Sequence, residues 1–160
     1  MQVASLAESQ NDWLRAMEAY GHVLEHNEDS VQALLQLSRI SQMQARYHDA
    51  VEYLHRVLKV DPSSGEVYGA LGHCYLTMSQ RSESVPEVLD CLRNCYTAYN
   101  EAARQHGTYL DANLWYGIGL LYERFGALMR PGSMRHECYR AAEEALSAVL
   151  KAAPNFPKYT

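Results

Sequence analysis

The chain has 160 residues, of which 48% are hydrophobic and 21% are charged, so it can bury one sizeable core and is too polar for a membrane protein. Its 14 Lys and Arg and its net charge of −5 exclude the clustered cations on which nucleic-acid affinity rests. The first residues lack the basic start and long apolar core of a signal peptide, and the four cysteines are irregularly spaced. Both features favour a reducing compartment inside the cell.

Apolar periodicity predicts helices along the whole chain, and no strand signal competes with it. The run Asp61-Pro62-Ser63-Ser64 is typical of a helix stop followed by a cap, and Ala153-Pro154-Asn155 repeats the stop. In chain order, the predicted helices cover residues 1–9, 13–26, 30–43, 47–59, 64–78, 86–106, 111–126 and 134–152. The sequence therefore predicts an all-α protein.

An internal repeat organises these helices. A shift of 34 residues places Ala16 on Ala50, and a second shift places Leu37 on Leu71. This period, with small and large residues alternating in two helical stretches, is the tetratricopeptide pattern of antiparallel helix pairs. We predict one domain, an all-α solenoid of about four repeats at residues 1–28, 29–62, 63–110 and 111–154. Because the first helix is short and the last residues look like the approach to another repeat, we expect an excerpt of a longer array.

The last two repeats are longer than the others, because Gly72 matches Gly119 at a spacing of 47 residues. Eleven residues are added to each, near 81–91 and within 129–140, between the two helices of the repeat. Eleven residues make about three whole helical turns, so an addition can lengthen the second helix without rotating its buried face. We predict that Gly72 and Gly119 lie where two helices cross.

No group of residues gives a strong signal for a catalytic, metal-binding or redox site. His22 and His26 have the spacing of a zinc-binding helix, but no Glu follows His22 as in H-E-x-x-H and no third ligand is obvious. Cys91 and Cys95 share a helix face without a CxxC pair to support a metal or redox site. No Ser-His-Asp or Cys-His arrangement is present, and the glycines of YGALG and YGIG lie inside helices, where no phosphate loop forms. We predict no enzyme, no metal site and no cofactor.

Stacked repeats create a concave surface that is lined by the first helix of each pair. Spacing along three successive first helices predicts a partner-binding groove, with Gly117 on the same face and with Tyr75, Trp115 and Tyr122 in the core. The predicted groove residues are Gln32, Leu35, Gln36, Arg39, Met43, Glu66, His73, Asn113, Tyr116, Leu120 and Arg124. A cochaperone that grips an acidic C-terminus would need several cations at set groove positions, where this chain has one. A cochaperone and a generic interaction scaffold are kept as alternative functions.

The runs VYGALGHCYLTM, LWYGIGLLYERFGAL and AAEEALSAVLKAAPNF resemble consecutive repeats of the tetratricopeptide subunit of the fungal general transcriptional corepressor, which partners a WD-repeat protein. The resemblance covers the chain except for the two eleven-residue additions, which the family pattern lacks. It implies a nuclear adaptor without catalytic chemistry. The implied partners are the WD-repeat corepressor subunit and sequence-specific, DNA-bound repressors, with no direct contact to nucleic acid or membrane.

Overall fold

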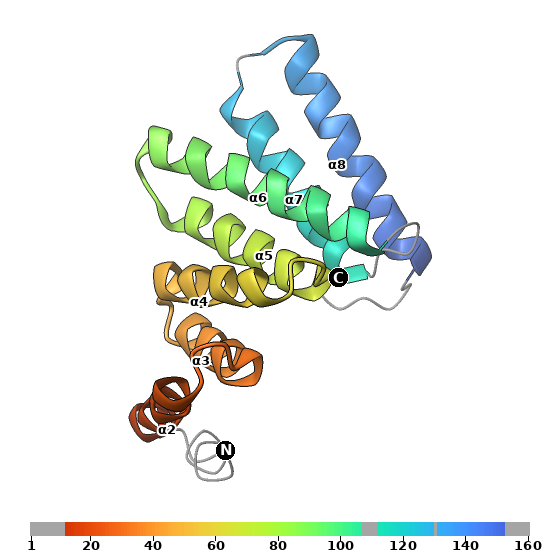
Figure 1. Cartoon of the computed structure of the whole chain (residues 1–160). Coiled ribbons are helices and arrows are strands. Elements are labelled where there is room, and N and C mark those ends of the chain that lie inside the picture. The colour runs from red at the N-terminus through yellow and green to blue at the C-terminus, as the bar shows by residue number, and fades with distance from the viewer. Residues whose placement is uncertain (1–11, 107–111, 130, 153–160) are drawn as a thin grey trace. The chain divides into compact units, whose positions relative to one another are not determined.

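The computed structural model describes residues 12–106, 112–129 and 131–152, and within these ranges it contains helices and no strand. The helices are α2 (Trp13–His26), α3 (Val31–Met43), α4 (Tyr47–Val60), α5 (Gly65–Arg81), α6 (Val85–His106), α7 (Ala112–Leu128) and α8 (Ser133–Ala152) (Figure 1). The all-α prediction is confirmed, and each of these helices begins and ends within three residues of its predicted bounds. The predicted helix at 1–9 lies outside the described residues.

The chain divides into two compact units, Met1–Val67 and Tyr68–Thr160, close to the predicted start of the third repeat. In the first unit α3 packs against α2 and α4, and in the second α7 packs against α6 and α8. The α2–α3 core centres on Tyr20, which is 1% exposed, together with Leu37 and Ile40. Two side chains cap these helices: Asp12 accepts from the backbone N–H of Arg15 and Ser30 accepts from that of Ala33, both at 3.4 Å.

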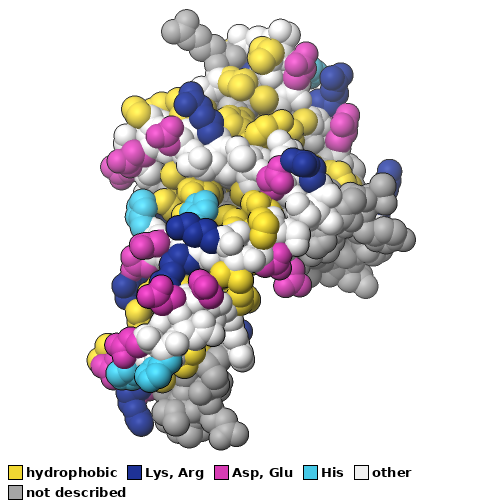
Figure 2. Space-filling model, in the orientation of Figure 1, with side chains coloured by type: hydrophobic (Ala, Val, Ile, Leu, Met, Phe, Trp, Pro, Cys, Tyr) yellow, Lys and Arg dark blue, Asp and Glu magenta, His cyan; other side chains and the backbone are white. Residues whose placement is uncertain are grey.

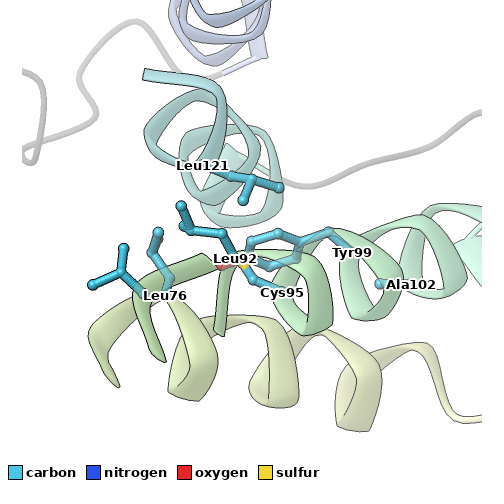
Figure 3. Close-up of a cluster of buried hydrophobic side chains, with 7 residues drawn as sticks. Leu76, Leu92, Cys95, Tyr99, Ala102 and Leu121 are labelled. Atoms are coloured by element: carbon cyan, nitrogen blue, oxygen red, sulfur yellow. The ribbon is translucent and has the colours of Figure 1, made fainter. Parts of the chain in front are cut away.

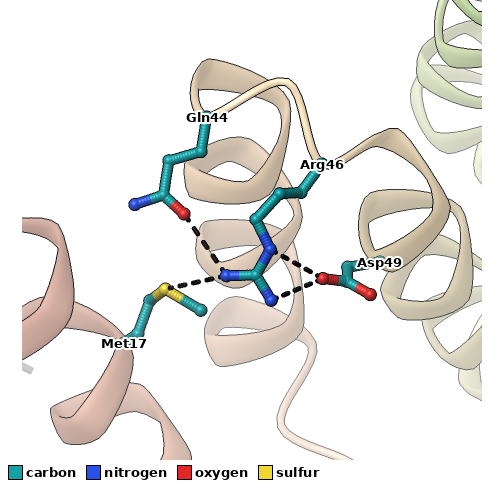
Figure 4. Close-up of polar contacts among 4 residues, drawn as sticks. All are labelled: Met17, Gln44, Arg46 and Asp49. Carbon is teal, nitrogen blue, oxygen red and sulfur yellow. Dashed lines mark hydrogen bonds and ion pairs between the residues drawn. The ribbon is translucent and has the colours of Figure 1, made fainter.

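The turn between α3 and α4 depends on a left-handed residue. Ala45 has a φ of 59°, and the N–H of Arg46 donates to the carbonyl of Ser41 at 2.7 Å, which closes the end of α3 as in a Schellman motif. The Arg46 guanidinium then donates to Asp49 at 2.8 Å and to Gln44 at 3.4 Å (Figure 4). Its Nη1 also lies 3.9 Å from the sulfur of Met17 on α2. The turn is thus tied to α2, α3 and α4.

Because Ala45 holds a conformation that glycine adopts without steric cost, we predict that Ala45→Gly stabilises the protein by about 0.5–1 kcal/mol. The gain is the relief of steric strain at Cβ, reduced by the greater freedom of glycine in the unfolded chain. Urea unfolding followed by circular dichroism measures the change. A lower free energy of unfolding in the variant would contradict the left-handed assignment.

The added residues lengthen both helices of each pair, whereas the sequence predicted a longer second helix only. The first helices α5 and α7 have 17 residues each against 13 in α3, and the second helices α6 and α8 have 22 and 20 against 14 in α4. The buried face of α6 is nevertheless continuous, because Val88 in the addition and Tyr99 eleven residues later are both buried. The core of this unit contains Leu76, Val88, Leu92, Cys95, Tyr99, Ala102 and Leu121 (Figure 3).

Glycines allow α5, α6 and α7 to approach closely. A Cβ built on Gly72 would lie 2.5 Å from Cδ1 and Cε1 of the Tyr99 ring, and one on Gly117 would lie 2.7 Å from its Cζ. The ring of Tyr99 therefore fills the space that both glycines leave. One period further on, a Cβ on Gly119 would lie 2.7 Å from Cγ and Cδ2 of Leu146. Helix crossings at Gly72 and Gly119 agree with the sequence prediction.

Gly72→Ala and Gly69→Ala form a matched pair on α5. No atom lies within 4 Å of a Cβ built at Gly69, so this substitution should gain the helix propensity of alanine, about 1 kcal/mol. At Gly72 the methyl group would collide with a buried ring, and we expect a net loss of about 1–3 kcal/mol from overpacking. Thermal unfolding distinguishes the two. Equal midpoints in the two variants would show that α5 and α6 do not cross at Gly72.

Candidate partner-binding surface

The exposed face of α3 carries five of the predicted groove residues. The opposite face is buried through Leu34, Leu37 and Ile40. On the open face Leu35 is 38% exposed and Met43 60% exposed, although both are large apolar side chains. The remaining three residues on this face are polar or charged, because Gln32 and Arg39 are exposed and Gln36 is partly buried. This helix contains no acidic residue, so the face combines apolar anchors with one cation and two amides.

The α5 face is small and polar. Glu66 and His73 are both exposed, as predicted for positions on the groove side of a first helix. Thr77 donates its hydroxyl hydrogen to the carbonyl of His73 at 2.9 Å, so this hydroxyl serves the helix itself. Gly69, which has no atom within 4 Å of a built Cβ, leaves the backbone of the same helix open.

The α7 face differs most from its prediction. Tyr116 is partly buried, and Leu120 packs against the core cluster of Leu76 and Tyr99. Gly117 was expected on the groove side, but it is buried against the hydroxyl end of Tyr99. The side chain of Asn113 lies outside the described residues. Much of the α7 face that was predicted to line the groove therefore packs toward the core of the second unit.

Arg124 has a structural partner. Its Nη2 donates at 3.2 Å to the carbonyl of Ser79, which belongs to the last turn of α5, where carbonyls have no N–H donor from the helix itself. The negative end of a helix also favours a nearby cation. Nε of Arg124 is buried without a hydrogen-bond partner. We infer that Arg124 ties α7 to the end of α5, which limits its availability to a partner.

The tyrosines and tryptophan predicted as core are only partly buried. Tyr75 packs against the core cluster of the second unit from its edge, and Trp115 and Tyr122 are also of intermediate exposure. Among the described residues, the buried aromatic side chains are Tyr20 and Tyr99. The ring of Tyr99 reaches Gly72 on α5 and Gly117 on α7, whereas the predicted three are closer to solvent.

Sequence reasoning missed a group of exposed apolar side chains around the two additions. They lie near the turns that join α5 to α6 and α7 to α8, at Val85, Leu128, Met134 and Tyr139. Tyr139 stacks against Arg135, whose guanidinium carbon is 5.6 Å from the ring centroid. Apolar residues at the solvent-facing positions of the predicted helix ends were the available signal.

The titratable groups show no catalytic arrangement among the described residues. Burial raises the pKa of Cys74 to about 12, and it also raises the pKa of Cys95, so both thiols stay protonated and unreactive. Cys91 and Cys138 are partly buried, and all four cysteines are free. Within residues 12–106, 112–129 and 131–152, no three His, Cys, Asp or Glu gather as metal ligands, and no helix has the length and apolarity needed to cross a bilayer.

Comparison with known proteins gives the same family that the sequence motifs resemble. The general transcriptional corepressor trfA of Dictyostelium discoideum is 39% identical over 154 residues, which cover 96% of this chain and 10% of trfA. The general transcriptional corepressor ssn6 of Schizosaccharomyces pombe is 37% identical over 158 residues, which cover 99% of this chain and 12% of ssn6. The chain thus spans about a tenth of the length of these relatives. No protein-family model matches it.

Solved structures confirm the fold. MamA superposes with a TM-score of 0.76 at 23% identity, over 98% of this chain and 77% of MamA. TTC0263, a thermophilic tetratricopeptide protein of Thermus thermophilus, superposes with a TM-score of 0.62 at 19% identity. The superposition covers 96% of this chain and 89% of TTC0263. The chain is therefore a tetratricopeptide-type repeat protein whose relatives, over nearly its whole length, are the ssn6 and trfA general transcriptional corepressors.

Proposed function

We propose that the chain is a non-enzymatic adaptor in transcriptional repression, working in the nucleus. It binds a WD-repeat corepressor subunit and DNA-bound repressors through the open faces of the first helices of its repeats. Two observations support this role: the relatives are general transcriptional corepressors, and α3 exposes apolar side chains on the face opposite its core. The net charge of −5 makes protein a better ligand than nucleic acid.

The α3 face is the observation that carries the proposal. Leu35 and Met43 are eight residues apart, which is about 12 Å along a helix, so one amphipathic helix can contact both. Apolar anchors hold such a ligand, and a neighbouring exposed polar group such as Gln32 fixes its register. Methionine adapts its shape to different partners, which suits an adaptor that binds several regulators. The partner segment proposed is the helical N-terminal part of the WD-repeat subunit.

Leu35→Ala should weaken binding of this segment by about 1–3 kcal/mol if Leu35 is an anchor. Leu14→Ala is the matched control, because Leu14 on α2 is more exposed, at 70%, and lies outside the proposed surface. Titration calorimetry of the purified chain against the segment measures both, and circular dichroism verifies helicity.

Equal affinities in the two variants would remove α3 from the binding surface. A folded wild-type chain that binds neither the segment nor a repressor would contradict the adaptor function itself.

A further inference from the structure

The exposed residues of α3 form a single stripe along the helix. They are Gln32, Leu35, Arg39 and Met43, at positions i, i+3, i+7 and i+11, and every other residue from 31 to 43 is buried or partly buried. We propose that Arg39 determines the specificity of this stripe, and that the ligand is an amphipathic helix with a carboxylate between two apolar positions. This inference rests on the proposed function and names the chemistry that the partner segment must carry.

Arg39 lies midway between the two apolar anchors. It follows Leu35 by four residues and precedes Met43 by four, which places it about 6 Å along the helix axis from each. A ligand helix that contacts both anchors must therefore pass over Arg39. The guanidinium group is covered by the same ligand that covers the anchors.

Covering Arg39 removes a charge from water, and this selects among ligands. A ligand without an acidic group at that point leaves the charge unpaired, which is unfavourable. A carboxylate accepts two parallel hydrogen bonds from a guanidinium group. Because this group has five N–H donors, it can bond a carboxylate in addition to the interaction that Arg39 makes within the chain. Specificity thus comes from the rejection of neutral and basic helices.

The charge of α3 itself is complementary to an acidic ligand. Arg39 is the only charged residue of Val31–Met43, and the helix contains no carboxylate that would repel one on the ligand. Acidic side chains lie elsewhere on the surface of the first unit, as Figure 2 shows. A single polar residue within an apolar helix seam also fixes the register of the two helices. Arg39 should therefore set where along α3 the ligand binds.

A double-mutant cycle by titration calorimetry tests the role of Arg39. The wild-type chain and Arg39→Gln are each titrated with the helical N-terminal segment of the WD-repeat subunit and with variants in which one Asp or Glu is replaced by its amide. We expect one such variant to bind the wild-type chain about tenfold more weakly than the unmodified segment does. The same variant should bind Arg39→Gln as tightly as the unmodified segment does, because the two changes remove one interaction.

Charge exchange separates pairing from a merely structural role. Arg39→Glu should recover most of the lost affinity when the segment carries lysine in place of that carboxylate. Arg140→Gln is the matched control, because it removes the same charge from an exposed position on α8 and should leave the affinity unchanged. Circular dichroism verifies that each variant is folded.

The outcomes distinguish this inference from the adaptor function. If no carboxylate of the segment couples to Arg39 while Leu35→Ala still weakens binding, the role of Arg39 is overturned and the adaptor function stands. If the folded wild-type chain does not bind the segment at all, the proposed ligand of α3 is wrong and this inference fails with it.

Discussion

The wedge of Tyr99 between Gly72 and Gly117 is the constraint on which the second unit depends. The ring is 5% exposed, and burial raises the pKa of its hydroxyl well above the usual range. Because neither glycine has a Cβ, one ring from α6 reaches the backbones of both α5 and α7. Three helices are thereby fixed by one side chain, and any group added at either glycine would enlarge the spacing of a close-packed core.

The binding surface follows from how each first helix divides its residues between core and solvent. The buried residues of α3 lie on one face of the helix, so Leu35 and Met43 remain exposed on the opposite face. In α7 fewer of the predicted groove residues remain available, because Leu120 packs against the core and Arg124 donates a hydrogen bond to the end of α5. The proposed adaptor surface is therefore strongest on α3. In the second unit, exposed apolar side chains such as Val85, Leu128 and Met134 lie near the turns between helices.

Sequence periodicity predicted every described helix and the crossings at Gly72 and Gly119, because the positions that a helix buries recur at helical spacing in its own sequence. It failed where the answer depends on a neighbouring helix. Gly117 and Gly119 are two residues apart and belong to different contacts, one with Tyr99 on α6 and one with Leu146 on α8. Periodicity along α7 cannot distinguish these contacts, and so Gly117 was expected in the groove. The role of Arg124 was missed because its acceptor is a backbone carbonyl, which every residue possesses.

The exposed surface was predictable in residue identity but not in availability. Leu35 and Met43 are exposed, whereas the hydrogen bonds of the His22 and His26 rings depend on side-chain rotamers. The spacing of such a pair can be read from the chain, and only the fold gives its orientation. For the same reason the left-handed Ala45 has no signature in composition, since alanine is otherwise a good helix residue.

Nuclear Overhauser contacts of the Tyr99 ring test whether it lies between Gly72 and Gly117. We predict strong contacts from the ring protons to the α-protons of both Gly72 and Gly117, with those α-protons shifted by the ring current. Contacts to only one glycine, or to neither, would contradict the three-helix wedge and the helix faces derived from it.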